Sequence, residues 1–90
     1  MRELYADSKS IAGEDGVPRQ FSYYILIDEM DINRRFACES YGIKVSERGG
    51  GSTSIPDITV DIKRIDELLN LLVRNAVGPA SLSDVVADWL

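Results

Sequence analysis

The chain contains no histidine and only one cysteine among its 90 residues. Without histidine, it lacks the commonest general acid or base near neutral pH and the commonest metal ligand. Cys38 alone cannot form an internal disulfide, and a small chain without a disulfide is typical of a reducing compartment. The opening residues MRELYADSKS lack the apolar segment of a secretory signal, and no apolar run approaches the ~20 residues that span a bilayer. We therefore expect a cytoplasmic protein that contacts no membrane.

The glycine-rich stretch SERGGGSTSIP lacks the features of a phosphate-binding loop. Such a loop needs a lysine after its last glycine and a helix that directs backbone amides at the anion. Here Gly51 is followed by Ser52, and Pro56 favours an extended backbone before it. The spacing G-x-G-x-x-G is also absent. The sequence therefore predicts a flexible Gly/Ser loop over residues 48–56.

The acidic stretch that begins at Asp28 resembles the start of a calcium loop only superficially. A calcium loop needs a glycine at its sixth position and a glutamate at its twelfth. Counting from Asp28 places Asn33 sixth and Glu39 twelfth, and counting from Glu29 satisfies neither position. A solvated hairpin turn is the better interpretation of these residues.

No set of residues in the sequence is typical of an enzyme. Cys38 has no histidine to activate it as a nucleophile, and a small buried apolar residue is its expected role. The paired carboxylates, Asp57 with Asp61 and Asp66 with Glu67, are explained by helix capping and by a solvated helix face. We therefore expect no catalytic residues, no cofactor and no metal.

Length and charge indicate one small domain that does not bind DNA. Ninety residues suit a single domain over residues 1–90. The net charge of −5 repels phosphate backbones. The terminal segment SLSDVVADWL has no Arg, Asn, Gln or Lys with which a recognition helix could read bases.

Alternating apolar residues predict a β-hairpin. Aromatic and β-branched residues with a period of two over residues 21–28 and 35–46 are typical of strands, and the short polar link between them favours an antiparallel pair. Gly42 interrupts the second strand and indicates a bulge or a close backbone approach. Residues 2–11 could add a short strand. The fold class that we predict is α+β, with a small antiparallel sheet of two to four strands within residues 2–47.

Two helices are predicted after the glycine-rich stretch. A broad apolar stripe over residues 62–77 predicts an amphipathic helix. Asp61 is a plausible N-cap, although Asp57 and Thr59 compete for that role. Gly78 and Pro79 then provide a stop signal, in which the glycine takes the left-handed cap position. A second helix over residues 81–90 begins at Ser81 as a cap, with Asp84 in its first turn, and uses Trp89 to pack against the rest of the chain. We expect these helices to cover one face of the sheet.

Several segments resemble a small family of functionally uncharacterised proteins of clostridia and related Firmicutes, catalogued as a domain of unknown function. The matching features are YYILI and YGIKV, the leucine-rich helix, the turn at Asn75, Val77 and Pro79, and the ending Asp-Val-Val-x-Asp-Trp-Leu at Asp84 to Leu90. The resemblance implies a bacterial single-domain protein of that class and brings no catalytic residues with it.

The function that we expect is non-enzymatic association, either with an unknown protein partner or as a homo-oligomer. The apolar strand faces and the wide helix stripe exceed what one small core readily covers. The candidate contact residues are Tyr24, Leu26, Arg34, Arg35 and Trp89. The alternative is a module that binds a small ligand or a single-stranded nucleic acid on its aromatic strand face.

Overall fold

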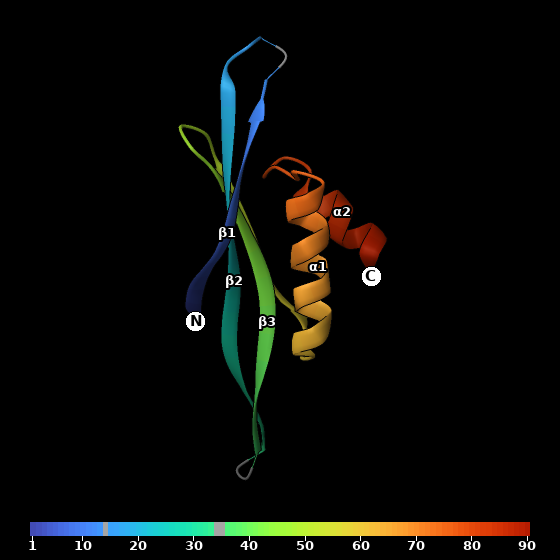
Figure 1. Ribbon diagram of the computed structural model, residues 1–90. Coiled ribbons are helices and arrows are strands. Elements are labelled where there is room, and N and C mark those ends of the chain that lie inside the picture. Colours follow the sequence, from blue (N-terminus) through green and yellow to red (C-terminus); the bar gives the residue numbers. More distant parts are fainter. Residues whose placement is uncertain (14, 34–35) are drawn as a thin grey trace.

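A computed structural model describes residues 1–13, 15–33 and 36–90, with the backbone alone at residues 30–33 and 36–37. Over these residues, four strands are followed by two helices, in agreement with the predicted α+β class (Figure 1). The elements are β1 (Arg2–Ala12), β2 (Pro18–Asn33), β3 (Phe36–Glu47), β4 (Ser52–Thr59), α1 (Ile62–Arg74) and α2 (Leu82–Trp89).

The sheet is an antiparallel meander with the strand order β1-β2-β3-β4. The predicted hairpin corresponds to β2 and β3, and residues 2–11 belong to β1. Strand β2 is longer than expected, whereas β3 has the expected length and lies one residue later than predicted. Residues 29–33, predicted to lie in the link between the two strands, continue β2, because pairing with β3 extends through Met30–Cys38 and Asp31–Ala37 to Asn33–Phe36.

The prediction of a loop over residues 48–56 is wrong for its second half. Glu47 donates its amide to the Gly51 carbonyl, and Gly50 donates to the Glu47 carbonyl, so the chain reverses within residues 48–51. Strand β4 then pairs with β3 from Ser52 onward. Strand β4 is at the edge of the sheet, so it has a neighbouring strand on one side only. Pro56 lacks a backbone N–H, and an edge strand tolerates this because no second neighbour needs that hydrogen bond.

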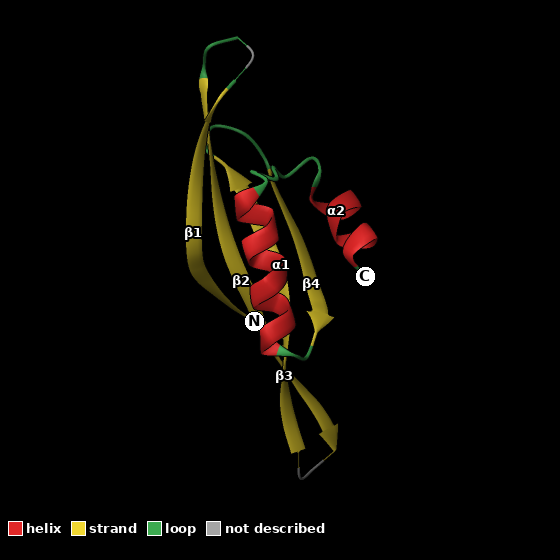
Figure 2. Cartoon of the chain, turned by 45° about the vertical axis from the view of Figure 1, so that its right-hand side comes forward, coloured by secondary structure: helices red, strands yellow, loops and turns green. Residues whose placement is uncertain are grey.

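Helix α1 lies on one face of the sheet, as predicted, and the core lies between them (Figure 2). Asp61 is its N-cap, because the Asp61 carboxylate accepts a hydrogen bond of 2.9 Å from the Lys63 amide. The apolar side chains on one face of α1 pack against every second side chain of β2 and β3, on the side of the sheet that faces the helix. The buried cluster consists of Phe21, Tyr23, Ile43, Val45, Ile65, Leu68, Leu69, Leu72, Val77, Leu82 and Val86.

Helix α1 ends earlier than predicted and with a different cap. The amides of Ala76 and Val77 donate to the carbonyls of Val73 and Leu72, which is the Schellman pattern. Ala76 therefore takes the left-handed conformation, with φ of 51°, and the assignment of this role to Gly78 is wrong. Gly78 instead packs closely against Phe21, because a Cβ there would lie 3.0 Å from the end of the Phe21 ring and the ring would have to shift.

Replacing Ala76 with glycine is expected to raise the free energy of unfolding by about 0.5–1 kcal/mol, since glycine adopts positive φ without the steric penalty of a Cβ. Urea denaturation measures the change. Ala80→Gly, at an exposed position without positive φ, is the control and should lower stability slightly, because glycine adds freedom to the unfolded chain. Equal losses in the two variants would contradict the proposed strain at Ala76.

Helix α2 matches the predicted position but not the predicted cap. Asp84 lies in its first turn, yet Ser81 has helical backbone angles and its side chain makes no capping hydrogen bond. Leu82 and Val86 are buried in the core cluster, so packing holds this short helix in place. Neither helix in the described part of the chain has the length and hydropathy that crossing a bilayer requires.

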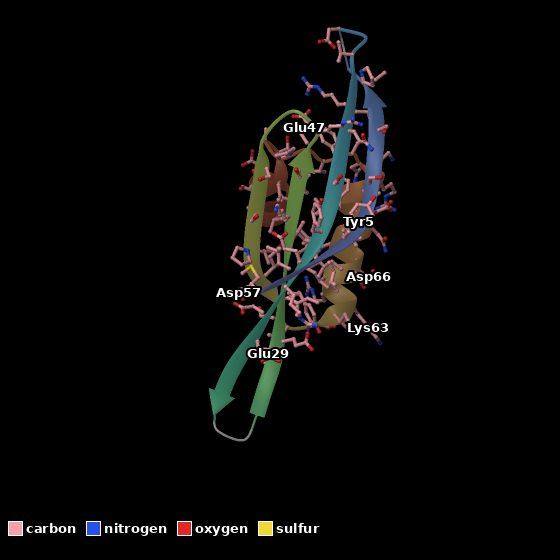
Figure 3. All side chains as sticks on the ribbon, turned by 90° about the vertical axis from the view of Figure 1, so that its left-hand side faces the viewer. Tyr5, Glu29, Glu47, Asp57, Lys63 and Asp66 are labelled. Atoms are coloured by element: carbon pink, nitrogen blue, oxygen red, sulfur yellow. The ribbon has the colours of Figure 1, made fainter. Side chains whose placement is uncertain are left out.

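The molecule is elongated, with extents of 54 × 23 × 17 Å. The β1–β2 hairpin extends past the helical layer at one end and the β2–β3 hairpin extends past it at the other (Figure 1). Both helices cover the same side of the sheet. The opposite side, which we call the outer face, carries no helix (Figure 3).

Candidate functional site

Four side chains from three strands form a cluster on the outer face. The register places Tyr5 beside Tyr24 and Tyr24 beside Lys44. The two tyrosine rings meet edge to face with centroids 5.8 Å apart. Lys44 Nζ lies 5.4 Å from the Tyr24 centroid and 3.0 Å from a carboxylate oxygen of Glu3. We call Glu3, Tyr5, Tyr24 and Lys44 the outer-face cluster.

The outer-face cluster offers an amphipathic surface, with two aromatic rings beside one ion pair. Its ion pair is partly exposed, so it contributes at most about 1 kcal/mol, and the cation–π contact adds a similar amount. Tyr5 is 61% exposed and presents a flat apolar ring to the surroundings (Figure 3). The cluster can therefore hold an apolar or planar group against the sheet, while Glu3 limits its affinity for anions.

Leu26, a predicted contact residue, is not available at the surface. It alternates onto the outer face with Tyr24 but is only 2% exposed. It pairs with Gly42, and the β4 backbone at Ile55 and Pro56 lies so close to Gly42 that a Cβ there would be 2.3 Å from the Ile55 carbonyl oxygen. The β4 backbone therefore covers this part of the outer face.

The other predicted contact residues that the structure describes, Trp89 and Tyr24, do not lie at one site. Trp89 is half-buried on α2 and packs against the core cluster, with the Arg64 guanidinium 4.5 Å from its ring centroid. Tyr24 lies in the outer-face cluster, on the side of the sheet without helices. Arg34 and Arg35 lie outside the described residues. Cys38, expected to be buried, is partly exposed on β3.

Tyr23 joins the sheet to the connection between the helices. Its hydroxyl donates a hydrogen bond of 2.9 Å to the Val77 carbonyl, and its side chain is fully buried. Burial, with a smaller effect from the Asp7 charge, raises the pKa of Tyr23 from 10.0 to about 12. The neutral phenol is therefore a structural link between β2 and the end of α1.

Stability is expected to fall at alkaline pH because of Tyr23. Below about pH 10 the Tyr23 phenol is protonated in both the folded and the unfolded chain, so its full contribution to the free energy of unfolding is present. Between pH 10 and about 12 the unfolded chain loses this proton while the folded chain keeps it, so the free energy of unfolding drops by roughly 1.4 kcal/mol per pH unit. Urea denaturation at successive pH values measures this slope.

Tyr23→Phe separates this effect from general alkaline damage. At neutral pH the variant should lose about 1–2 kcal/mol of stability, because the buried Val77 carbonyl loses its donor. Between pH 10 and 12 it should lack the slope due to Tyr23. Tyr5→Phe, at an exposed position, should keep the slope, and identical pH profiles for the two variants would refute the assignment.

The sequence predicts residues 2–11 only as a possible short strand, and it does not identify β1 as an exposed edge. Strand order makes β1 one of the two edges of the sheet, and most of its side chains are exposed. Met1, Leu4 and Tyr5 are 69%, 49% and 61% exposed. The period-two signal is disrupted here because the register shifts between Tyr5 and Asp7, which changes the face on which successive residues lie.

Two open grooves lie along the β1–β2 hairpin and share Ile11 and Arg19, and the second also borders the connection between the two helices. Their volumes are about 500 and 480 Å³. The second is also lined by Phe21 and by Glu47, which forms an ion pair of 3.8 Å with Arg19. Among the residues that the structure describes, no three acidic or cysteine side chains gather closely enough to hold a metal ion.

Comparison with known proteins relates the chain to one family. The model of a family of unknown function, DUF6514, matches residues 2–90. No curated protein and no solved structure matches the chain.

Proposed function

The chain belongs to this family of unknown function, and we propose that it is a non-enzymatic protein that associates with another protein or with copies of itself. The observation that carries the proposal is the open edge of β1, along which apolar side chains are exposed. Leu4 and Tyr5 lie on opposite faces of this strand, so both faces contribute apolar surface to the edge. Exposed apolar residues grouped at one place are typical of interaction sites.

Light scattering after size-exclusion chromatography tests self-association. We expect the mass to rise above that of one 10.0 kDa chain as the protein concentration increases. The double variant Leu4→Ser, Tyr5→Ser should shift this rise to higher concentration, since it removes exposed apolar area without touching the buried cluster. A strict monomer at high concentration would refute self-association.

The setting that we propose is the cytoplasm of clostridia and related Firmicutes. The ending at Asp84 to Leu90 supports this taxonomic range, and the single cysteine supports a reducing compartment. The net charge of −5 favours protein partners over DNA and anionic membranes. Fractionation of the native host with antibodies against the protein tests the compartment.

A second candidate function is binding of a small ligand or a single-stranded nucleic acid on the outer-face cluster. The exposed Tyr5 ring and the Lys44 ammonium favour it, since stacking and cationic contacts are how such ligands bind to sheets. A thermal-shift screen with nucleotides and short single strands tests this function, because a ligand of the folded state raises the melting temperature. Tyr5→Ala should abolish any shift that arises at this cluster.

A further inference from the structure

We propose that β1 is the self-association site, where two copies pair their β1 strands antiparallel with Ser8 opposite Ser8. This inference rests on the proposed function and specifies the partner as a second copy of the chain. The two sheets would then join into one sheet of eight strands, with a two-fold axis perpendicular to it.

The two edges of the sheet differ in their capacity to pair. Strand β4 contains Pro56, which lacks an amide, and Asp57 with φ of 55°. Its register with β3 also shifts, so that residues 56–58 lie opposite Gly42 alone. Such features protect an edge from pairing. Strand β1 has 11 residues without proline, and after its own bulge at Ala6 it pairs regularly with β2 from Asp7 to Ala12.

Charges on β1 favour one register. In a two-fold antiparallel pair, centring on Ser8 places each Asp7 opposite Lys9 of the second copy. Shifting the centre by one residue would instead place Asp7 against Asp7, or Lys9 against Lys9, and like charges opposite each other are destabilising. Of these three registers, the one centred on Ser8 therefore places opposite charges beside each other, and the other two place like charges together.

The two charged side chains are placed to serve in such pairs. Asp7 and Lys9 pair with Tyr23 and Phe21, so both lie on the side of the sheet that carries the helices. Lys9 Nζ donates to the Arg74 carbonyl at 3.2 Å, which leaves two of its three N–H donors for an incoming carboxylate. Asp7 Oδ1 accepts a hydrogen bond of 2.8 Å from the Ser8 amide, and pairing centred on Ser8 would exchange this contact for one with Lys9 of the second copy. Within the described part of the chain, no basic side chain forms an ion pair with Asp7.

The bulge extends the same register to an apolar pair. In a β-bulge, two residues of one strand lie opposite a single residue of the other. If Tyr5 and Ala6 lie opposite Ser10 of the second copy in this way, Leu4 lies opposite Ile11 of that copy. Leu4 pairs with Ile25, and Ile11 packs against the buried cluster, so both lie on the side that carries the helices. Pairing would cover Leu4, which is 49% exposed in the single chain. The Asp7–Lys9 pairs and the Leu4–Ile11 pairs therefore both form in the register centred on Ser8.

A charge exchange tests this arrangement by sedimentation velocity. Asp7→Lys and Lys9→Asp should each weaken the dimer roughly tenfold or more, because each creates two like-charge pairs across the two-fold axis. The double variant Asp7→Lys, Lys9→Asp should restore the affinity to within about threefold, since it exchanges the partners of the same pairs. Thermal unfolding checks that each variant is folded. Lys63→Asp and Asp66→Lys, exposed on α1, match these charge changes and should leave the dimer unaffected.

Cross-linking tests the centre of the register independently of charge. In a Cys38→Ser background, Ser8→Cys should give a disulfide-linked dimer under mild oxidation, because residues directly opposite in antiparallel strands lie about 4.5–5.5 Å apart at Cα. Ser54→Cys on β4 should remain monomeric under the same conditions.

The outcomes separate this inference from the function on which it rests. A wild-type dimer that is insensitive to the β1 charges, or charge variants that weaken it without rescue by the exchange, would overturn pairing through β1 while self-association through another surface stands. A wild-type chain that remains monomeric at every concentration would overturn both. Loss in each single variant with recovery in the double variant supports the pairing.

Discussion

Replacing Gly42 with alanine is expected to lower the free energy of unfolding by about 3 kcal/mol, because the new Cβ has no space. An ideal Cβ at this position would lie 2.3 Å from the Ile55 carbonyl oxygen and 2.6 Å from Pro56 Cα. Both atoms belong to the backbone of β4, so no side-chain rotation can relieve the overlap. The strand must move away from β3, which disrupts the pairing on both sides of the bulge.

Gly51→Ala is the matched control for Gly42→Ala. Gly51 has no atom within 4 Å of its ideal Cβ, and its φ is not positive. The control should therefore change stability by less than about 0.5 kcal/mol or raise it slightly, since alanine restricts the unfolded chain. Urea denaturation measures both variants. Similar losses at the two glycines would show that the close approach of β4 to Gly42 is not a constraint on the fold.

Truncating Leu72 to alanine is expected to lower the free energy of unfolding by about 3–4 kcal/mol, the typical cost of a leucine removed from a packed core. Leu72 has no exposed surface and lies in the cluster formed by α1, α2 and the sheet. It is close to the end of α1, where its carbonyl also accepts the Val77 amide. The cavity would therefore lie beside the link between α1 and the sheet, where the surrounding elements cannot easily close it.

Ile62→Ala on the same helix is the control for Leu72→Ala. Ile62 is 63% exposed, so its truncation removes little buried area and places a better helix former at the first position of α1. Its effect should remain within about 0.5 kcal/mol. Chemical denaturation followed by Trp89 fluorescence reports both changes. Equal effects in the two variants would contradict packing of the α1 stripe against the sheet.

The amphipathic helix was predictable because its signals are local. The spacing of Ile65, Leu68 and Leu72 defines one helical face, and Asp61 caps a neighbouring amide within the same turn. The end of α1 was less predictable. Gly78 follows the helix and suits a left-handed cap, but packing against Phe21 uses this glycine for close contact, and Ala76 takes the left-handed position.

The surface residues were the least predictable part of the candidate site. Tyr24 and Leu26 share a face in any regular strand, yet Leu26 is buried while Tyr24 is partly exposed. The difference comes from the β4 backbone over Gly42, which is 13 residues distant from Ile55 in the chain. Periodicity identifies the face of a strand, but it contains no information about which segment folds over that face.

The amino-acid sequence by itself determined the class of the fold, the β2–β3 hairpin and the two helices, because period-two and helical patterns depend on neighbours within a few residues. The tertiary structure alone decided that Ser52–Thr59 is a strand and that β1 is an exposed edge. A short polar segment such as β4 becomes a strand when a longer strand supplies its hydrogen bonds, and an edge is defined by the absence of a neighbour. Both properties arise from pairing between distant segments, so no local pattern could contain them.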